Sequence, residues 1–212
     1  MVKAVIFDMD DLMIKSEALH FQAYKKVAEE FGIDFTREDY WRLWGLDKEM
    51  CERFVKEFKL KTSWEEVLLK KNAVYRSTLH TIQPKKGLFE LLKKLKAGQY
   101  LIAVASGSQL YEVDAVLNNL GIKHYFDEII SAETVENGKP SPEGFLLAAK
   151  RLHVLPEACL VLEDSPRGIQ AARAAGMKCF AIPSEGVKES QVSDATKILS
   201  SLKEVYTLLK EI

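Results

Sequence analysis

The sequence is poor in cysteine, and its cysteines show no pairing pattern. Among 212 residues there are three, Cys51, Cys159 and Cys179, which are widely separated and have no CxxC spacing. An odd, scattered set of this kind argues against a disulfide framework and against a cysteine-ligated zinc site. Cys159 and Cys179 fall in apolar runs, where a small buried thiol is the ordinary interpretation.

The chain also lacks a long apolar run and an excess of charge of either sign. No stretch approaches the roughly 20 apolar residues that cross a bilayer. No signal peptide is visible, because Lys3 is followed directly by a short apolar run that ends in acidic residues. The net charge of −1 leaves no basic footprint for nucleic acid or an anionic membrane. We therefore expect a soluble, cytoplasmic protein, monomeric by default, whose partner is a small molecule.

Five short, uninterrupted apolar runs predict buried strands. Runs without polar alternation are typical of strands covered on both faces, as in a parallel sheet. They lie at Ala4–Phe7, Leu101–Ala105, Glu128–Ile130, Cys159–Leu162 and Lys178–Ile182. Helical patterns lie at Gly87–Ala97, Tyr111–Leu120, Pro142–Leu152, Ser165–Ala175 and near Leu202–Leu209. The regular alternation predicts an α/β fold, a doubly wound, Rossmann-like parallel sheet.

The region from about Ser16 to His80 breaks this alternation and shows helical periodicity only. One helix face carries His20, Tyr24, Val27 and Phe31. Three positions are suited to N-capping a helix, namely Thr36, Asp47 and Ser63. We predict four helices inserted after the first strand, a helical cap domain over residues 16–80 that is well placed to act as a lid. The α/β core domain would then be formed by residues 1–15 and 81–212.

Two further expectations concern side chains of this insert. The three tryptophans are expected in its core rather than on a stacking surface, at Trp41, Trp44 and Trp64. The adjacent lysines Lys70 and Lys71 are expected on a solvated helix face.

Polar residues gather after the predicted strands. Asp8-Met9-Asp10-Asp11 follows the first strand, Ser106-Gly107-Ser108 the second and Glu163-Asp164-Ser165 the run ending at Leu162, while Gly138-Lys139-Pro140 comes one small loop after Ile130. In an open α/β sheet, ligands bind beyond the carboxyl ends of the strands. We therefore expect the four segments to converge in one crevice.

This set of groups suits magnesium and a phosphate. Carboxylates packed together repel one another, and their hard oxygen atoms suit Mg²⁺. The small-residue turn at Ser106 offers N–H and hydroxyl donors to phosphate oxygens, and Lys139 adds a positive charge. No Ser-His-Asp set, GxGxxG or GxxxxGK[ST] motif stands among them. Magnesium-assisted phosphoryl transfer to a carboxylate uses every group present.

The same four segments resemble the ordered motifs of the haloacid dehalogenase superfamily, and most closely its β-phosphoglucomutase-like phosphatases. The matching residues are Phe7-Asp8-Met9-Asp10, Ala105-Ser106-Gly107-Ser108, Gly138-Lys139-Pro140-Ser141-Pro142-Glu143 and Leu162-Glu163-Asp164-Ser165. The resemblance covers nearly the whole chain, and the insert resembles that family's small helical cap. A single such motif is weak evidence, whereas four in order, each after its strand, are strong.

The resemblance implies a role for each residue. Asp8 would be the nucleophile and Asp10 the general acid and base. Ser106, Gly107 and Lys139 would bind the transferring phosphoryl group. Magnesium would be held by Asp8, the carbonyl of Asp10, Asp164 and, directly or through a second contact, Glu163. In the cap, His20 and Lys48 would contact substrate.

The implied function is hydrolysis of a small phosphorylated metabolite, such as a sugar or polyol phosphate, through an aspartyl phosphate. A β-phosphoglucomutase-like phosphomutase is the alternative, although that cap usually has arginine where this chain has Lys48. A degenerate, non-catalytic binding module is the third interpretation. It is motivated by Asp11, where the family usually has glycine, and by Lys15, where it usually has an acidic residue.

Each motif also has a purely structural interpretation. Asp8 and Asp10 alone could form a solvated turn, and Ser106 could only cap the following helix. Lys139 could be a surface lysine in a turn. His20 could equally be a packed core histidine, and Lys48 an exposed lysine at a helix start.

Overall fold

The computed structural model describes residues 1–45 and 47–209. The chain divides into two compact units. The α/β unit consists of Met1–Lys15 and Gln83–Ile212, and the helical unit of Ser16–Ile82. Leu46 and residues 210–212 lie outside the described residues.

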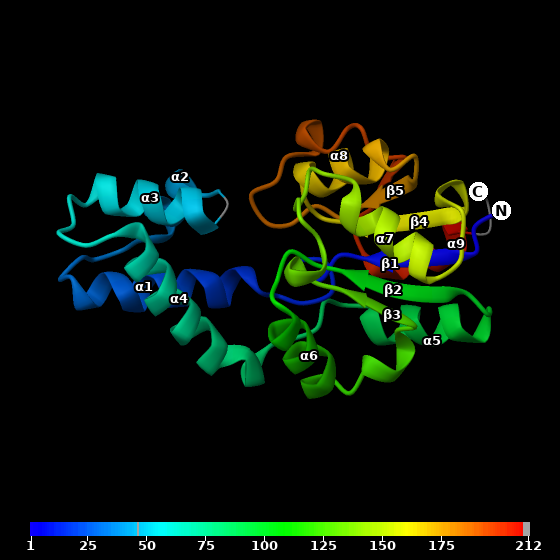
Figure 1. The fold of residues 1–212 in the computed structure, drawn as a ribbon, viewed down its shortest axis with the longest axis horizontal. Coiled ribbons are helices and arrows are strands. Elements are labelled where there is room, and N and C mark those ends of the chain that lie inside the picture. Colours follow the sequence, from blue (N-terminus) through cyan, green and yellow to red (C-terminus); the bar gives the residue numbers. More distant parts are fainter. Residues whose placement is uncertain (46, 210–212) are drawn as a thin grey trace. The chain divides into compact units, whose positions relative to one another are not determined.

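The α/β unit is built on a parallel sheet of six strands in the order β3-β2-β1-β4-β5-β6 (Figure 1). The strands are β1 Ala4–Phe7, β2 Leu101–Ala105, β3 Glu128–Ile130, β4 Cys159–Glu163, β5 Lys178–Ala181 and β6 Lys197–Ile198. The predicted parallel α/β fold is confirmed. The two-residue strand β6 was not predicted, because so short a segment carries no periodicity.

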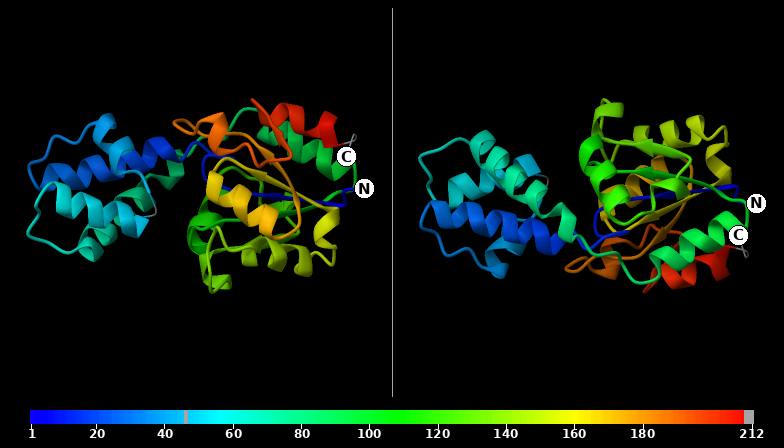
Figure 2. Two further views of the ribbon diagram at one scale, coloured as in Figure 1. Left: turned by 90° about the horizontal axis from the view of Figure 1, so that it is seen from above. Right: turned by 90° about the horizontal axis from the view of Figure 1, so that it is seen from below.

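Helices cover both faces of this sheet. Helices α7 and α8 pack on one face, while α5 and α9 lie on the other, as the two views of Figure 2 show. The helices are α5 Leu88–Ala97, α6 Leu110–Asn119, α7 Glu143–Arg151, α8 Pro166–Ala174 and α9 Val205–Leu209. Beneath α7 and α8 the core is continuous from Ile6 and Val161 of the strands to Phe145 and Ile169 of the helices. Because both faces are buried at the centre of the sheet, the strands β1 and β2 are apolar throughout.

The helical unit has its own core. Its helices are α1 Glu17–Glu30, α2 Arg37–Leu43, α3 Asp47–Glu57 and α4 Trp64–Thr78. Thr36 caps α2 by accepting from the backbone N–H of Asp39, and Ser63 caps α4 by accepting from that of Glu66. The core is rich in aromatic side chains, namely those of Phe21, Tyr24, Phe35, Tyr40 and Phe54.

Short 3₁₀ turns complete the connections in both units. They lie at Leu79–Thr81, Lys123–Tyr125, Ala132–Thr134, Pro156–Ala158, Glu189–Gln191 and Leu202–Glu204. In the described residues no helix is both long and apolar enough to cross a membrane. The three cysteines are buried free thiols.

Three expectations for the helical unit were wrong. Asp47 does not precede α3 as a cap but is its first residue. Lys71 is not on a solvated face, because its side chain is only 1% exposed. Trp44 is 42% exposed, whereas Trp41 and Trp64 pack against the core as expected.

The chain leaves the α/β unit after Lys15 and re-enters it at Gln83. The two connecting segments are hydrogen-bonded to each other. The N–H of Lys15 donates to the carbonyl of Gln83 at 2.9 Å, and the N–H of Lys85 donates to the carbonyl of Met13 at 2.8 Å. Ile14 and Pro84 form an antiparallel bridge between them.

Candidate active site

The candidate site lies at the carboxyl edge of the sheet, where four loops of the α/β unit meet. Phe7 of β1 is in register with Val104 of β2 and with Leu162 of β4. The residues that follow these positions therefore emerge side by side. This register, and not proximity in sequence, brings Asp8 to the same level as Glu163, with Ser106 one residue further along from β2.

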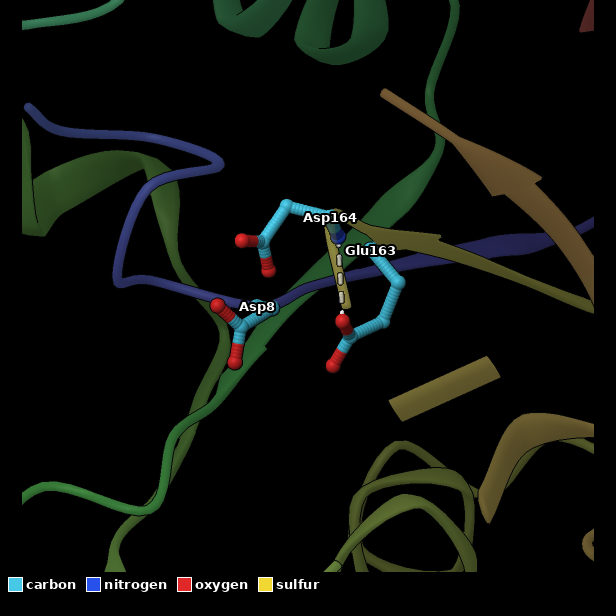
Figure 3. Close-up of side chains that lie close together, drawn as sticks. All are labelled: Asp8, Glu163 and Asp164. Atoms are coloured by element: carbon cyan, nitrogen blue, oxygen red, sulfur yellow. Dashed lines mark hydrogen bonds between the residues drawn. The ribbon is translucent and has the colours of Figure 1, made fainter. Parts of the chain in front are cut away.

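Three carboxylates come together at this edge. Asp8, Glu163 and Asp164 each offer an oxygen atom, and these atoms all lie within 4.8 Å of one another. Figure 3 shows the three side chains pointing into one small region from β1 and from the end of β4. All three residues are buried. So dense a group of carboxylates in a site shielded from water calls for positive charge.

Lys139 supplies part of that charge. Its ammonium donates to Oδ1 of Asp8 and, at 2.6 Å, to Oε1 of Glu163. The Lys139 side chain is 21% exposed, so it reaches the acidic group from the open side of the site. This lysine is therefore a member of the site and not a surface lysine in a turn.

Glu163 is held more tightly than its neighbours. Its side chain is fully buried, and Oε2 accepts from the backbone N–H groups of Asp164 and Ser165, each at 3.0 Å, and from the Ser165 hydroxyl at 2.9 Å. The carboxylate lies directly against Gly168, where a Cβ atom would be only 1.7 Å from Oε1. The first turn of α8 must therefore carry glycine at this position for Glu163 to face Lys139.

The ionisation of these groups reflects their crowding. Burial raises the pKa of the Asp8 carboxyl well above its usual value, Lys139 opposes this, and Glu163 and Asp10 add to it. Burial and the carboxylates of Glu163, Asp8 and Asp11 likewise raise the pKa of Asp164. Burial would lower the pKa of Lys139, but attraction to Asp8 and Glu163 raises it above its usual value. The lysine is charged, and the carboxyls still lack a sufficient counter-charge.

Asp10 points to the second loop. Its Oδ2 accepts from the Ser108 hydroxyl at 2.7 Å, and the Ser106 hydroxyl lies 3.5 Å from the same oxygen. The Ser106 hydroxyl in turn accepts from the N–H of Ser108 at 3.0 Å. Next to these serines, Gly107 lines a cavity of about 140 Å³ that also borders Lys139.

Asp11 adopts the backbone conformation that glycine would adopt more easily. Its φ is +54°, in the left-handed region, and the residue is 9% exposed. Its carboxylate acts electrostatically on Asp164. The departure from the usual glycine therefore adds backbone strain and negative charge next to the acidic group.

The donor set fits a divalent cation. Asp8 and Asp164 present oxygen atoms close together, and the burial and mutual repulsion that raise their pKa values are what a bound cation would offset. Hard oxygen ligands of this kind suit Mg²⁺. Both oxygens of Glu163, by contrast, are engaged by four protein donors, three at Oε2 and Lys139 at Oε1.

The two candidate residues of the helical unit have local partners. His20 is half-buried, and its ring stacks on Tyr75 with centroids 4.1 Å apart and planes 9° from parallel. Lys48 is 64% exposed, with its ammonium 3.9 Å from Glu52 and 5.2 Å from the centre of the Trp64 ring.

Two residues of the site could not be assigned a role from the sequence. Ser108 belongs to the Ala105-Ser106-Gly107-Ser108 motif. Its hydrogen bond to Asp10 could not be inferred, because a sequence does not reveal the direction of the Asp10 side chain. Gly168 could have been noticed as a glycine in the first turn of a helix, where it weakens helix propensity. Only the structure shows that Glu163 occupies the space of its missing side chain.

Comparison with known proteins agrees with this geometry. The family model described as haloacid dehalogenase-like hydrolase matches residues 5–182. A protein of Thermotoga maritima named phosphorylated carbohydrates phosphatase is 34% identical over 182 residues, covering 84% of this chain and 83% of that protein. The β-phosphoglucomutase of Bacillus subtilis is 34% identical over 199 residues, covering 90% of this chain and 85% of that protein.

A solved structure is similar over almost its full length. CbbY from Rhodobacter sphaeroides, in complex with phosphate, has a TM-score of 0.82 and 28% identity, covering 97% of this chain and 96% of that one. Both units of the present chain thus have counterparts in one known structure.

Proposed function

We propose that this chain releases phosphate from a small phosphorylated metabolite through a phosphoryl group carried on Asp8. The premise is that the chain belongs to the haloacid dehalogenase-like hydrolase family and is a phosphoric monoester hydrolase. The observation that carries this proposal is the position of Asp8 at the end of β1, buried between Lys139 and Asp164. The relative that acts on phosphorylated carbohydrates supports a sugar or polyol phosphate as the substrate class.

The proposed chemistry has two steps. An Oδ atom of Asp8 attacks phosphorus and displaces the alcohol oxygen, which takes a proton from Asp10. Asp10 then accepts a proton from a water molecule as that water attacks the phosphorus of the aspartyl phosphate. Inorganic phosphate leaves, and Asp8 is regenerated. The hydrogen bond from Ser108 to Asp10 supports this role, since it orients a carboxyl that has to serve both steps.

Charge stabilisation is the main task in such a transfer. Lys139 is proposed to turn its ammonium toward the phosphoryl oxygens, and Ser106 and the backbone N–H of Gly107 to donate to them. The bond between Lys139 and Asp8 supports this, because it places the ammonium at the nucleophile before substrate arrives.

Magnesium is the proposed cofactor. Asp8, Asp164 and the backbone carbonyl of Asp10 would hold the ion. When bound, it would offset negative charge on the phosphoryl oxygens as a Lewis acid. Glu163 is proposed to orient Lys139, and not to bind the metal directly, because its oxygens already accept four hydrogen bonds.

The helical unit is proposed to carry residues that select the substrate, with His20 and Lys48 as candidates. Lys48 is exposed and its nearest carboxylate is 3.9 Å away, which leaves its ammonium available to an anionic or hydroxylated group. Replacing either residue with alanine would raise KM for the best substrate more than it lowers kcat.

A phosphomutase is the second candidate, because the Bacillus subtilis relative is named β-phosphoglucomutase. The two reactions share the aspartyl phosphate and differ in what accepts its phosphoryl group. Supplying a sugar bisphosphate and following interconversion of 1- and 6-phosphosugars separates them from simple phosphate release.

The test is a screen of phosphorylated metabolites for release of inorganic phosphate with Mg²⁺ and with EDTA. We expect release with Mg²⁺, none with EDTA, and recovery when Mg²⁺ is restored. Asp8→Asn is the matched control, since it keeps the side-chain shape and removes the nucleophile. Turnover in that variant equal to the parent chain would refute Asp8 as nucleophile. Absence of turnover with every substrate would favour the binding-module interpretation.

A further inference from the structure

Arg167 contacts the backbone of the residue that supplies the ammonium. Its Nε donates to the carbonyl oxygen of Lys139 at 3.1 Å, and its Nη2 donates to the same oxygen. Arg167 stands in the first turn of α8, one residue before Gly168 and four after Glu163. One short segment therefore contacts Lys139 at both ends, with Glu163 at the ammonium and Arg167 at the carbonyl.

The loop that carries Lys139 needs such a contact. Pro140 follows Lys139, so this peptide unit offers an acceptor and no donor and cannot be tied by ordinary ladder bonds. The start of the loop is fastened elsewhere, because the carboxylate of Glu143 accepts from the N–H groups of Glu136 at 2.7 Å and Asn137 at 2.9 Å. Arg167 acts further along, at the catalytically important residue itself.

The chemistry of the contact fits a positioning role. A guanidinium donating two N–H groups to one carbonyl forms a charge-assisted bond, which is stronger and more directional than a neutral one. Arg167 is exposed, so its removal leaves no cavity and no buried unpaired group. Any effect of removing it should be confined to the loop.

We propose that Arg167 is a positioning residue that fixes the Lys139 loop to the first turn of α8, so that the ammonium of Lys139 meets the phosphoryl group in one orientation. The proposal rests on the proposed function for the role of Lys139, and on the structure alone for the tether. Without Arg167, Lys139 keeps its charge but samples more positions, and phosphate is bound less tightly.

The chain offers a matched control on the same helix. Arg173 also stands on α8 and is exposed, but it pairs with Asp194 at 2.8 Å, away from the loop. Arg167→Ala and Arg173→Ala therefore remove the same charge from one helix. Arg167→Lys keeps the charge and loses the forked geometry.

The experiment combines two measurements on the full chain with Mg²⁺. Calorimetric titration with inorganic phosphate gives the dissociation constant, and hydrogen–deuterium exchange followed by mass spectrometry reports the backbone from Glu136 to Glu143. In Arg167→Ala we expect affinity for phosphate to fall about tenfold, because phosphate binding must then order a loop that Arg167 holds in place in the parent chain. Exchange in this segment should become faster, with the melting temperature within a degree or two of the Arg173→Ala value. Arg167→Lys should lie between the parent chain and Arg167→Ala.

Two results would overturn the proposal. One is equal loop exchange in Arg167→Ala and Arg173→Ala. The other is faster exchange throughout α8 with a lower melting temperature, which would make Arg167 a general stabiliser of the helix. Because loop exchange is measured also without phosphate, it decides the tether even for a protein that hydrolyses nothing. Failure of the proposed function would instead appear in the parent chain, as absence of magnesium-dependent phosphate release.

Discussion

Each unit of the molecule pairs a lysine with carboxylates, and the two lysines have different surroundings. In the α/β unit, Lys139 meets Asp8 and Glu163, which come from two other loops. In the helical unit, Lys71 of α4 meets Asp47 of α3, with Nζ 2.8 Å and 2.9 Å from its two oxygens. Lys139 faces more carboxylate than one ammonium can offset, whereas Lys71 forms a one-to-one pair.

The two lysines also differ in how far they and their partner carboxylates are exposed to solvent. Lys71 is 1% exposed while its partner Asp47 is 52% exposed, so the pair has a buried cation and a wetted anion. Around Lys139 the order is reversed, with the lysine side chain 21% exposed and that of Glu163 fully buried. An arrangement that leaves a cation reachable and carboxylates in excess suits binding of metal and phosphate. A closed pair suits structural support.

The largest expected effect is the difference between replacing Lys139 and replacing Lys71 with methionine. Lys139→Met should lower the proposed magnesium-dependent turnover about 10³-fold, because it would remove the group that we propose offsets charge in the transition state. Lys71→Met should change the free energy of unfolding by less than about 1 kcal/mol, because the half-exposed Asp47 is then solvated. Steady-state kinetics and urea titrations check the two. A Lys139→Met variant that retained its turnover would contradict the assignment.

The next largest effect is expected at Gly168, which lies against the carboxylate of Glu163. In Gly168→Ala the new Cβ would meet Oε1 of Glu163 at 1.7 Å, so the buried carboxylate has to move and Lys139 loses a partner. We expect turnover to fall on the order of 10²-fold and the protein to lose about 2 kcal/mol of stability. Gly144→Ala in α7 is the control, because its Cβ meets nothing closer than 3.9 Å. Equal kinetics in the two variants would show that Glu163 can rotate away without consequence.

The third prediction tests the pair in the helical unit. Asp47→Asn leaves a buried ammonium without a counter-charge and should cost about 2 kcal/mol at pH 7, less than for a fully buried pair because Asp47 is half-exposed. Urea unfolding followed by tryptophan fluorescence is a local measurement, since Trp41, Trp44 and Trp64 all lie in this unit. Lys71→Met is the control and should be nearly neutral.

The same pair predicts a pH dependence. Burial alone would raise the pKa of Asp47, but Lys71 and then His20 attract the carboxylate and lower the pKa below its usual 3.8. The pair therefore stabilises the unit above about pH 4, and this contribution is lost as the pH falls through the lowered pKa. The stability difference between the parent chain and Asp47→Asn should shrink over that range. A difference constant from pH 7 to 3 would contradict the ion pair.

The smallest expected effect concerns Asp11. Asp11→Gly should raise the free energy of unfolding without metal by about 1 kcal/mol, since glycine adopts positive φ without strain. Gln99→Gly is the conformational control, because Gln99 has a φ of +61° at the end of α5. Asp11→Asn removes the charge and keeps the residue shape. Thermal unfolding in EDTA checks all three variants. If Asp11→Gly stabilised the protein no more than Gln99→Gly does, the negative charge of Asp11 next to Asp164 would not contribute to the effect.

The comparison of the two lysines also shows what the sequence could predict. The central strands were predictable because burial on both faces makes them almost continuously apolar, and their parallel direction places the following loops at one edge of the sheet. Lys139 could be noticed because it followed such a strand among other chemically distinctive groups. Its contact with Arg167 carried no signal, since a carbonyl acceptor is the same at every residue.

Lys71 could not be placed for a different reason. Lys70 and Lys71 are adjacent, and one helical step of about 100° decides which of them faces inward. Lys70 turned outward to Glu30, while Lys71 turned toward the core between the rings of Tyr24 and Tyr75. Amphipathic periodicity gives no warning of a buried charge, because it is the partner carboxylate that makes the burial tolerable.

The hydrogen-bonded crossing of Met13–Lys15 and Gln83–Lys85 has a consequence for how this chain can be re-engineered. The two segments by which the chain leaves and re-enters the α/β unit lie side by side, so the helical unit is inserted into the α/β unit at a single point. We expect that replacing residues 16–82 with a two-residue turn would leave a foldable α/β protein that retains the carboxylate cluster. We expect that a different helical module could be inserted at the same point, which would change substrate preference while the residues of the carboxylate cluster stay the same.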